Sequence, residues 1–153
     1  NIRKINISYI GDANNIAISF AKIARILKLK FTFCCPKKYS KPLAKIINDK
    51  TGLSLTADTN EAFYNADVIY TDVWTSMGME KENAIRLKDF KKYQVTKILM
   101  EKTNNKSVFM HCLPAHIGEE VTSDVINSDK SIVYQQAENK LYSAMAIIDF
   151  FLS

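Results

Sequence analysis

Four short polar clusters in this sequence carry side chains that could take part in chemistry, and each follows a run typical of a strand. Residues 107–114 read SVFMHCLP, so an apolar run leads directly into a His-Cys pair. The other clusters are GDANN at 11–15, TDVWTSMG at 71–78 and QQAEN at 135–139. If the runs are parallel strands of one sheet, the clusters meet at its carboxyl edge, where α/β proteins bind ligands. That edge would collect Asp12, Asn14, Asn15, Asp72, Ser76, His111, Cys112 and Glu138.

Taken together, these groups suit the head of an amino acid. The Asp72 carboxylate can meet an α-ammonium, while the Asn15 carboxamide and the hydroxyl and amides around Ser76 and Met77 can meet an α-carboxylate. Cys112 then lies beside the far end of the ligand, where its sulfur can hydrogen-bond an amine or accept a proton.

Each residue alone also has a structural explanation. Asn14 or Asn15 can cap the first helix, and Cys112 can be a small buried apolar residue. A metal site built from His111, Cys112 and His116 is a further alternative. Adjacent strand residues point to opposite faces, and no Cys-x-x-Cys or His-x-x-x-His spacing supports such a site. We therefore expect no metal.

Candidate strands alternate with amphipathic helices along the whole chain. Strands are expected at 5–11, 30–36, 53–58, 67–74, 107–113 and 131–136. Helices are expected at 14–28, at 41–51 with Ser40 as its cap and Gly52 beyond its end, and at 60–66, 80–94, 95–103, 119–128 and 137–153. The alternation predicts an α/β fold of the Rossmann-like type, a single domain over 1–153 whose mainly parallel sheet has helices on both faces.

Composition and charge argue against several other classes of protein. The 153 residues are 47% hydrophobic and can build one core, and the lysines behind the net charge of +5 are scattered, so we expect no nucleic-acid partner. No apolar run approaches the ~20 residues that span a bilayer, and residues 1–12 lack a signal-peptide pattern, so we expect a cytoplasmic protein with no membrane partner. Cys34, Cys35 and Cys112 have no disulfide-framework spacing. A dinucleotide-binding domain would need a Gly-x-Gly-x-x-Gly segment, but Gly11 is alone there.

In this order, the stretches GDANN, TDVWTSMG, FMHCLPAH and QAEN resemble the C-terminal, ornithine-binding domain of ornithine carbamoyltransferase, and they span residues 8–140. The cysteine within HCLP favours a diamino acid over aspartate as substrate. The resemblance implies transfer of a carbamoyl group from carbamoyl phosphate to the δ-amine of L-ornithine, giving L-citrulline and phosphate in arginine metabolism. It implies no cofactor, and family members are usually homotrimers.

The resemblance also implies which residues hold the ornithine head. Carried over by motif, these are Asn15, Asp72, Ser76 and Met77. Asn14 replaces Asn15 if the register of the Asn pair is shifted by one position.

Cys112 and Asp72 are the implied catalytic residues, with the Cys112 thiol beside the δ-amine as the nominal proton acceptor. The amine must be neutral to attack, so the site has to favour its deprotonation. Leu113 is implied to offer its backbone carbonyl to the carbamoyl amide. Lys140 stands where the family usually has an arginine that contacts carbamoyl phosphate, and lysine keeps the charge but loses the bidentate geometry.

The Ser-Thr-Arg-Thr-Arg and His-Pro-x-Gln segments of the family's N-terminal carbamoyl-phosphate domain do not occur in these 153 residues. We therefore expect that domain to be absent from this chain and the chain alone to be inactive. An apolar stripe on the last helix indicates a partner surface, although its first part, 141–145, is expected to cover the chain's own sheet. The alternatives are a freestanding amino-acid-binding module and a carbamoyltransferase for a related amine such as putrescine or N-acetylornithine.

Overall fold

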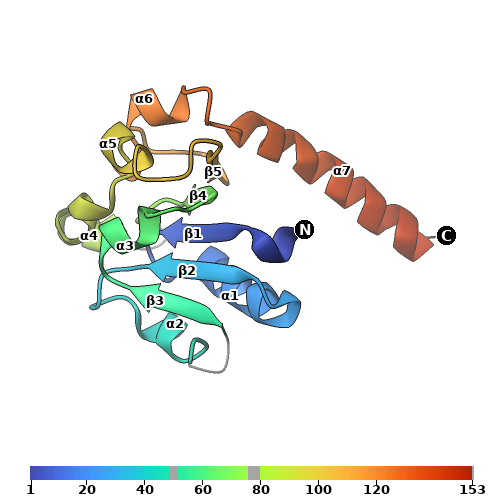
Figure 1. Ribbon diagram of the computed structural model, residues 1–153, viewed down its shortest axis with the longest axis horizontal. Helices are drawn as coiled ribbons and strands as arrows, with labels where there is room; N and C mark the ends of the chain where they lie inside the picture. The colour runs from blue at the N-terminus through green and yellow to red at the C-terminus, as the bar shows by residue number, and fades with distance from the viewer. Residues whose placement is uncertain (49–51, 76–79, 153) are drawn as a thin grey trace.

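A five-stranded parallel sheet forms the centre of the computed structural model, which describes residues 1–48, 52–75 and 80–152 (Figure 1). The strand order is β3-β2-β1-β4-β5, and every neighbouring pair is parallel. The predicted α/β class and parallel sheet are confirmed. The strands are β1 (Asn6–Ile10), β2 (Lys30–Cys34), β3 (Leu53–Thr56), β4 (Val68–Thr71) and β5 (Val108–His111).

Helices cover both faces of the sheet, as predicted. Alternate residues along each strand point to opposite faces, so Tyr9 packs with α1 and α2 while Ile10 packs with α3 to α6. The helices are α1 (Asn15–Leu27), α2 (Lys41–Ala44), α3 (Thr59–Phe63), α4 (Asn83–Phe90), α5 (Lys97–Met100), α6 (Ser123–Ile126) and α7 (Val133–Leu152). Short 3-10 helices are η1 (Ile2–Lys4), η2 (Glu80–Glu82) and η3 (Lys91–Tyr93).

The point where the strand order reverses lies between β1 and β4. Ile10 pairs with Thr71, and Thr71 pairs with His111, so the loops that follow β1, β4 and β5 leave the sheet side by side. Gly11 opens the loop after β1 with a φ of +141°, a conformation that side-chain-bearing residues rarely adopt. Three of the four predicted polar clusters therefore share one edge.

Several predicted helices are shorter in the structure. Of the helix expected between Ser40 and Gly52, residues up to 48 contain only α2, because the amides of Ile46 and Ile47 both bond to the Leu43 carbonyl and end the regular ladder; residues 49–51 lie outside the described ranges. Ser40 does not cap it, since its hydroxyl donates to the Lys37 carbonyl instead. The segments 95–103 and 119–128 likewise contain only the single turns α5 and α6.

The strand predicted at 131–136 is wrong. The chain makes one bridge to the edge strand, Phe109 to Ser131, and α7 begins two residues later at Val133. A short apolar run cannot be assigned to strand or helix by its periodicity alone. The QQAEN cluster consequently lies in the first turns of α7.

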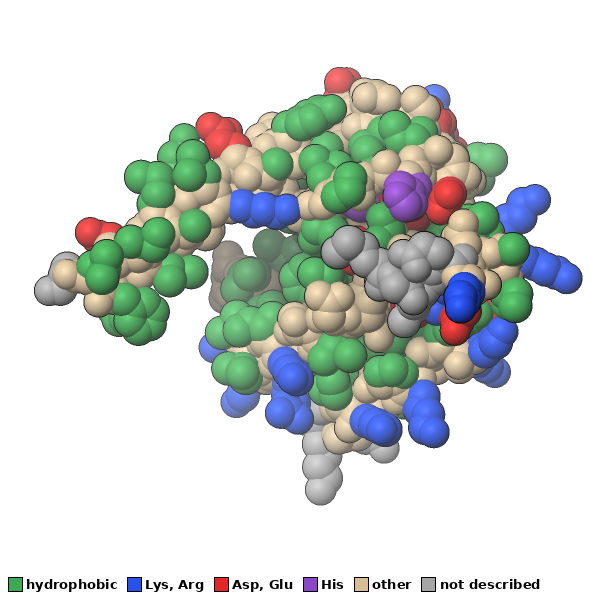
Figure 2. Space-filling view, turned by 180° about the vertical axis from the view of Figure 1, so that it is seen from behind, with side chains coloured by type: hydrophobic (Ala, Val, Ile, Leu, Met, Phe, Trp, Pro, Cys, Tyr) green, Lys and Arg blue, Asp and Glu red, His purple; other side chains and the backbone are tan. Residues whose placement is uncertain are grey.

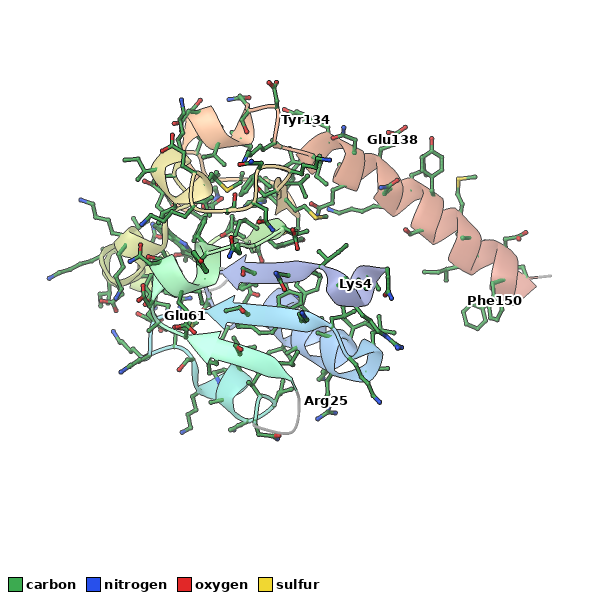
Figure 3. The ribbon with its side chains drawn as sticks, viewed as in Figure 1. Lys4, Arg25, Glu61, Tyr134, Glu138 and Phe150 are labelled. Atoms are coloured by element: carbon green, nitrogen blue, oxygen red, sulfur yellow. The ribbon has the colours of Figure 1, made fainter. Side chains whose placement is uncertain are left out.

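Helix α7 projects away from the rest of the chain (Figure 1), and Phe150 lies at its far end, away from the sheet (Figure 3). Val133 is its buried residue, whereas Leu141 and Met145 are 60% and 56% exposed, so the expectation that 141–145 covers the sheet is wrong. Large apolar side chains run along this helix (Figure 2). Among the described residues, no helix combines the length and apolarity that crossing a membrane requires.

Candidate functional site

Asp72 is the centre of the polar network at the carboxyl edge of the sheet. It directly follows β4 and is buried. Its Oδ2 accepts a hydrogen bond from Asn14 Nδ2 at 2.7 Å. Its Oδ1 accepts from the Val73 amide at 2.8 Å and from the Cys112 thiol at 2.9 Å. One carboxylate thus connects the loops that follow β1, β4 and β5.

Asn14 both caps α1 and contacts Asp72. Its Oδ1 accepts from the amides of Ile16 and Ala17 at 3.0 and 3.1 Å, which leaves the NH₂ group to donate to Asp72. Asn14 therefore serves both as the cap of α1 and as a member of the polar network. Asn15 is the first residue of α1 and is exposed, so of the Asn pair it is Asn14 that bonds to Asp72.

The Cys112 thiol is held in its protonated form by its surroundings. Partial burial, and then the hydrogen bond and negative charge of Asp72, raise the pKa of this thiol to about 12. The Tyr70 hydroxyl and the Lys140 ammonium act in the opposite direction on that pKa. Near neutral pH the group is a thiol that donates to a carboxylate, which is a poor nucleophile and a poor metal ligand.

His111 points to the other face of the sheet from Cys112 and does not line the predicted rim. Its Nε2 lies 3.0 Å from Glu120 Oε1, and both side chains are fully buried. The Leu113 amide donates to His111 Nδ1 at 2.9 Å, so Nε2 carries the proton and donates to Glu120. Leu113 has a φ of +52° and is followed by a cis bond to Pro114. The histidine thus fixes the turn that places Cys112 and Leu113.

Sequence reasoning missed Glu120. The signal was a buried histidine on a strand, which needs a partner, followed by two adjacent glutamates. Nothing in that pattern distinguishes Glu119 from Glu120, and the structure selects Glu120. Its Oε1 also accepts from the His116 amide at 2.7 Å.

The alternative metal site built from His111, Cys112 and His116 does not assemble. The Cys112 sulfur faces Asp72, and the His111 ring faces Glu120. Over the described ranges, the one grouping with metal-ligand atoms within 4.8 Å of each other is His116, Glu119 and Glu120, of which Glu120 already pairs with His111.

Two other predicted rim carboxylates do not bond to the network around Asp72. Asp12 forms a buried ion pair with Arg86, whose Nε donates to the Trp74 carbonyl at 2.7 Å. Burial raises the pKa of Asp12 despite this pairing. Glu138 is exposed on α7 (Figure 3) and accepts from the Tyr142 hydroxyl, so its predicted place at the rim is wrong because the strand before it does not exist.

Lys140 and Gln136, on the first turns of α7, hold the end of β5. Lys140 Nζ donates to the Cys112 carbonyl at 2.6 Å. Gln136 Oε1 accepts from the His111 amide at 3.1 Å, and its Nε2 donates to the Tyr70 hydroxyl at 3.0 Å. The site therefore includes α7 through contacts that the motif QQAEN did not predict. Ser76 and Met77 lie outside the described residues.

The chain is similar to carbamoyltransferases in both sequence and structure. The sequence model of a family described as "Aspartate/ornithine carbamoyltransferase, Asp/Orn binding domain" matches residues 3–151. The ornithine carbamoyltransferase of Syntrophus aciditrophicus is 40% identical over 97% of this chain and 51% of the relative. The chloroplastic enzyme of Pisum sativum is 43% identical over 92% of this chain and 38% of its own length.

Solved structures give the same match. The ornithine carbamoyltransferase of Thermus thermophilus superimposes with a TM-score of 0.88 at 34% identity, covering 100% of this chain and 50% of that one. The enzyme of Pyrococcus furiosus superimposes with a TM-score of 0.86 at 39% identity, covering 97% and 50%. The chain spans about half the length of the curated relatives it matches.

Proposed function

Because the chain belongs to the aspartate/ornithine carbamoyltransferase family, we propose that it is the ornithine-binding half of an ornithine carbamoyltransferase. The reaction is transfer of the carbamoyl group of carbamoyl phosphate to the δ-amine of L-ornithine, yielding L-citrulline and phosphate. A separate N-terminal domain, outside these 153 residues, would supply most of the carbamoyl-phosphate site. The observation that carries the proposal is the network of Asn14, Asp72 and Cys112 at the switch point of the sheet.

The ornithine head is assigned to Asn15, Asp72, Ser76 and Met77. The arrangement around Asp72 supports this assignment, because its carboxylate is held rigidly by three donors from its own chain and can pair with an ammonium without reorganising. If the asparagine that contacts ornithine is the one that bonds to Asp72, the contact is made by Asn14 and not by Asn15.

The proton chemistry requires a relay between Cys112 and Asp72. A thiol whose pKa is about 12 already carries its proton, so it accepts a second only as it gives up the first. We assign the transfer in one step: the sulfur takes a proton from the ornithine amine while its own proton passes to Asp72 Oδ1. The amine becomes neutral, the carboxylate becomes protonated, and the thiol is unchanged.

The Leu113 carbonyl and Lys140 belong to the carbamoyl-phosphate side. Leu113 offers its carbonyl to the carbamoyl amide from the turn that His111 fixes. Lys140 brings a positive charge within 2.6 Å of the Cys112 carbonyl, and so places that charge beside the reacting groups. Neither role uses a metal or an organic cofactor.

The test is citrulline formation from carbamoyl phosphate and L-ornithine. The 153-residue chain alone is expected to give none, and addition of a carbamoyl-phosphate domain from a relative is expected to restore turnover and a homotrimer. Turnover by the chain alone would refute the half-enzyme assignment. Tight ornithine binding without restored turnover would favour a freestanding amino-acid-binding module. Faster turnover with putrescine or N-acetylornithine would reassign the substrate.

A further inference from the structure

At the edge of the sheet beside Cys112, a backbone amide of β5 is hydrogen-bonded by the Gln136 side chain, where a further strand would otherwise pair. The Phe109 amide donates to the Lys130 carbonyl at 2.7 Å, and the Ile132 amide donates to the Phe109 carbonyl at 3.0 Å. The next outward-facing amide of β5 is that of His111, and there the neighbouring chain has already turned into α7. Gln136 Oε1 accepts this amide at 3.1 Å. An edge-strand amide adjoining the thiol is therefore satisfied by one glutamine.

The bond to His111 fixes the direction of the hydrogen bonds that follow. Since Gln136 accepts through Oε1, its Nε2 is the atom that donates to the Tyr70 hydroxyl oxygen, at 3.0 Å. The Tyr70 hydrogen is then left for another acceptor. Tyr70 and Cys112 pack in the same cluster, and the Tyr70 hydroxyl lowers the pKa of the Cys112 thiol, so we infer that this hydrogen points to the sulfur. The thiol hydrogen is directed to Asp72 Oδ1 at 2.9 Å. Every member of the series donates toward Asp72.

The placement of Tyr70 agrees with this series. Tyr70 pairs with Met110 in the neighbouring strand and lies on the same face of the sheet as Cys112. Stacking on Tyr9, with ring centroids 6.1 Å apart, and an edge contact with Phe20 at 4.7 Å hold its ring. The ring is thus located by packing, and the Gln136 amide decides where its hydroxyl hydrogen points.

We propose that Tyr70 and Gln136 are positioning residues, which orient the Cys112 thiol so that its hydrogen faces Asp72 and one sulfur lone pair stays free for an incoming amine. The catalytic meaning of this orientation rests on the proposed function. The orientation itself does not, because it can be measured on the chain without substrate. If the two residues only attach α7 to the sheet, their substitution should change the stability of the chain and leave the pKa and the alkylation rate of the Cys112 thiol unchanged.

The test is the rate at which iodoacetamide alkylates Cys112 across the alkaline pH range, followed by mass spectrometry of the Cys112 peptide in the 153-residue chain. Tyr70→Phe removes the donor to sulfur and keeps the ring, so the thiol pKa rises and the rate at fixed pH falls about threefold to tenfold. Gln136→Met lowers the rate less, because the hydroxyl is present but no longer oriented. Matched controls are Tyr64→Phe and Gln135→Met, whose side chains are exposed.

The double variant separates positioning from attachment. If Gln136 acts through Tyr70, combining Tyr70→Phe with Gln136→Met gives the rate of Tyr70→Phe alone. A further fall in the double variant, or control-like rates in both single variants, overturns the proposal. Should Gln136→Met unfold, Gln136→Glu serves instead: it still accepts from the His111 amide, cannot donate to Tyr70, and is expected to slow alkylation. Failure of citrulline formation would leave these rates unchanged, so the two proposals fail separately.

Discussion

At the carboxyl edge of the sheet, the polar side chains of Asn14, Asp72 and Cys112 bond to one another, whereas along α7 the large apolar side chains are exposed. In the first region each of these three side chains has a hydrogen-bond partner from the same chain. In the second region, large apolar side chains of the kind usually found in a core are exposed at the surface (Figure 2). The contrast teaches that the polar network and the exposed apolar helix are separate regions, which meet at the first turns of α7 through Gln136 and Lys140.

The largest effect is expected where the network is broken at its centre. Asp72→Asn keeps the size of the side chain and removes the proton acceptor, so carbamoyl transfer by the reassembled enzyme should fall about 10³-fold, or about 4 kcal/mol in the barrier. The measurement is kcat/KM for citrulline formation. Asp89→Asn, on the exposed ion pair with Lys38, is the control and should leave the rate unchanged. Comparable rates for the two variants would remove Asp72 from the mechanism.

A second prediction concerns the buried support of the same edge. Arg86→Met leaves the Asp12 carboxylate buried without its partner and removes a bond to the Trp74 carbonyl, so the free energy of unfolding should fall by about 3 kcal/mol. Urea denaturation measures the change. Lys38→Met breaks an ion pair at the surface and should leave the midpoint unaltered. Equal losses in both variants would mean that burial does not decide the strength of these pairs.

The pH dependence of Cys112 sharpens the comparison further. Burial and Asp72 raise the pKa of this thiol to about 12, so its alkylation by iodoacetamide should still be accelerating above the ordinary thiol pKa of about 8.5. Asp72→Asn removes the negative charge and should speed alkylation about tenfold at a given pH, the opposite sign to Tyr70→Phe. An alkylation curve of wild type that levels off near pH 9 would contradict the assigned environment.

How far the sequence could predict this molecule differs between the sheet and the edge contacts. The parallel sheet followed from repeated apolar runs, and the placement of Asp72 and Cys112 at one edge followed from the rule that parallel strands end at the same edge of a sheet. Arg86 and Glu120 could not be assigned, because each is selected by a partner that folding brings near it from another element. Such pairings leave no periodic signal in a single sequence.

The missed start of α7 has the same origin. Ser131 and Ile132 have the pattern of a strand, and the chain does run beside β5 there. What ends the strand is that the helix from Val133 packs its first turn on the sheet while Gln136 satisfies the next amide. Local preference was overridden by one tertiary hydrogen bond and one buried side chain.

The smallest effect is predicted on α7 itself. Phe151 is 77% exposed, so Phe151→Ser should change the free energy of unfolding of this chain by less than about 0.5 kcal/mol. Val133→Ala, at the buried start of the same helix, should cost about 1–2 kcal/mol because it leaves a cavity against the sheet. Denaturation of both variants beside wild type gives the comparison.

With a carbamoyl-phosphate domain present, Phe151→Ser should become the more damaging of the two for assembly, since its ring would then be buried against a partner. If Phe151→Ser instead destabilises the isolated chain as much as Val133→Ala does, α7 packs on its own sheet in solution. The contrast between the hydrogen-bonded edge around Asp72 and an exposed apolar helix would then be wrong.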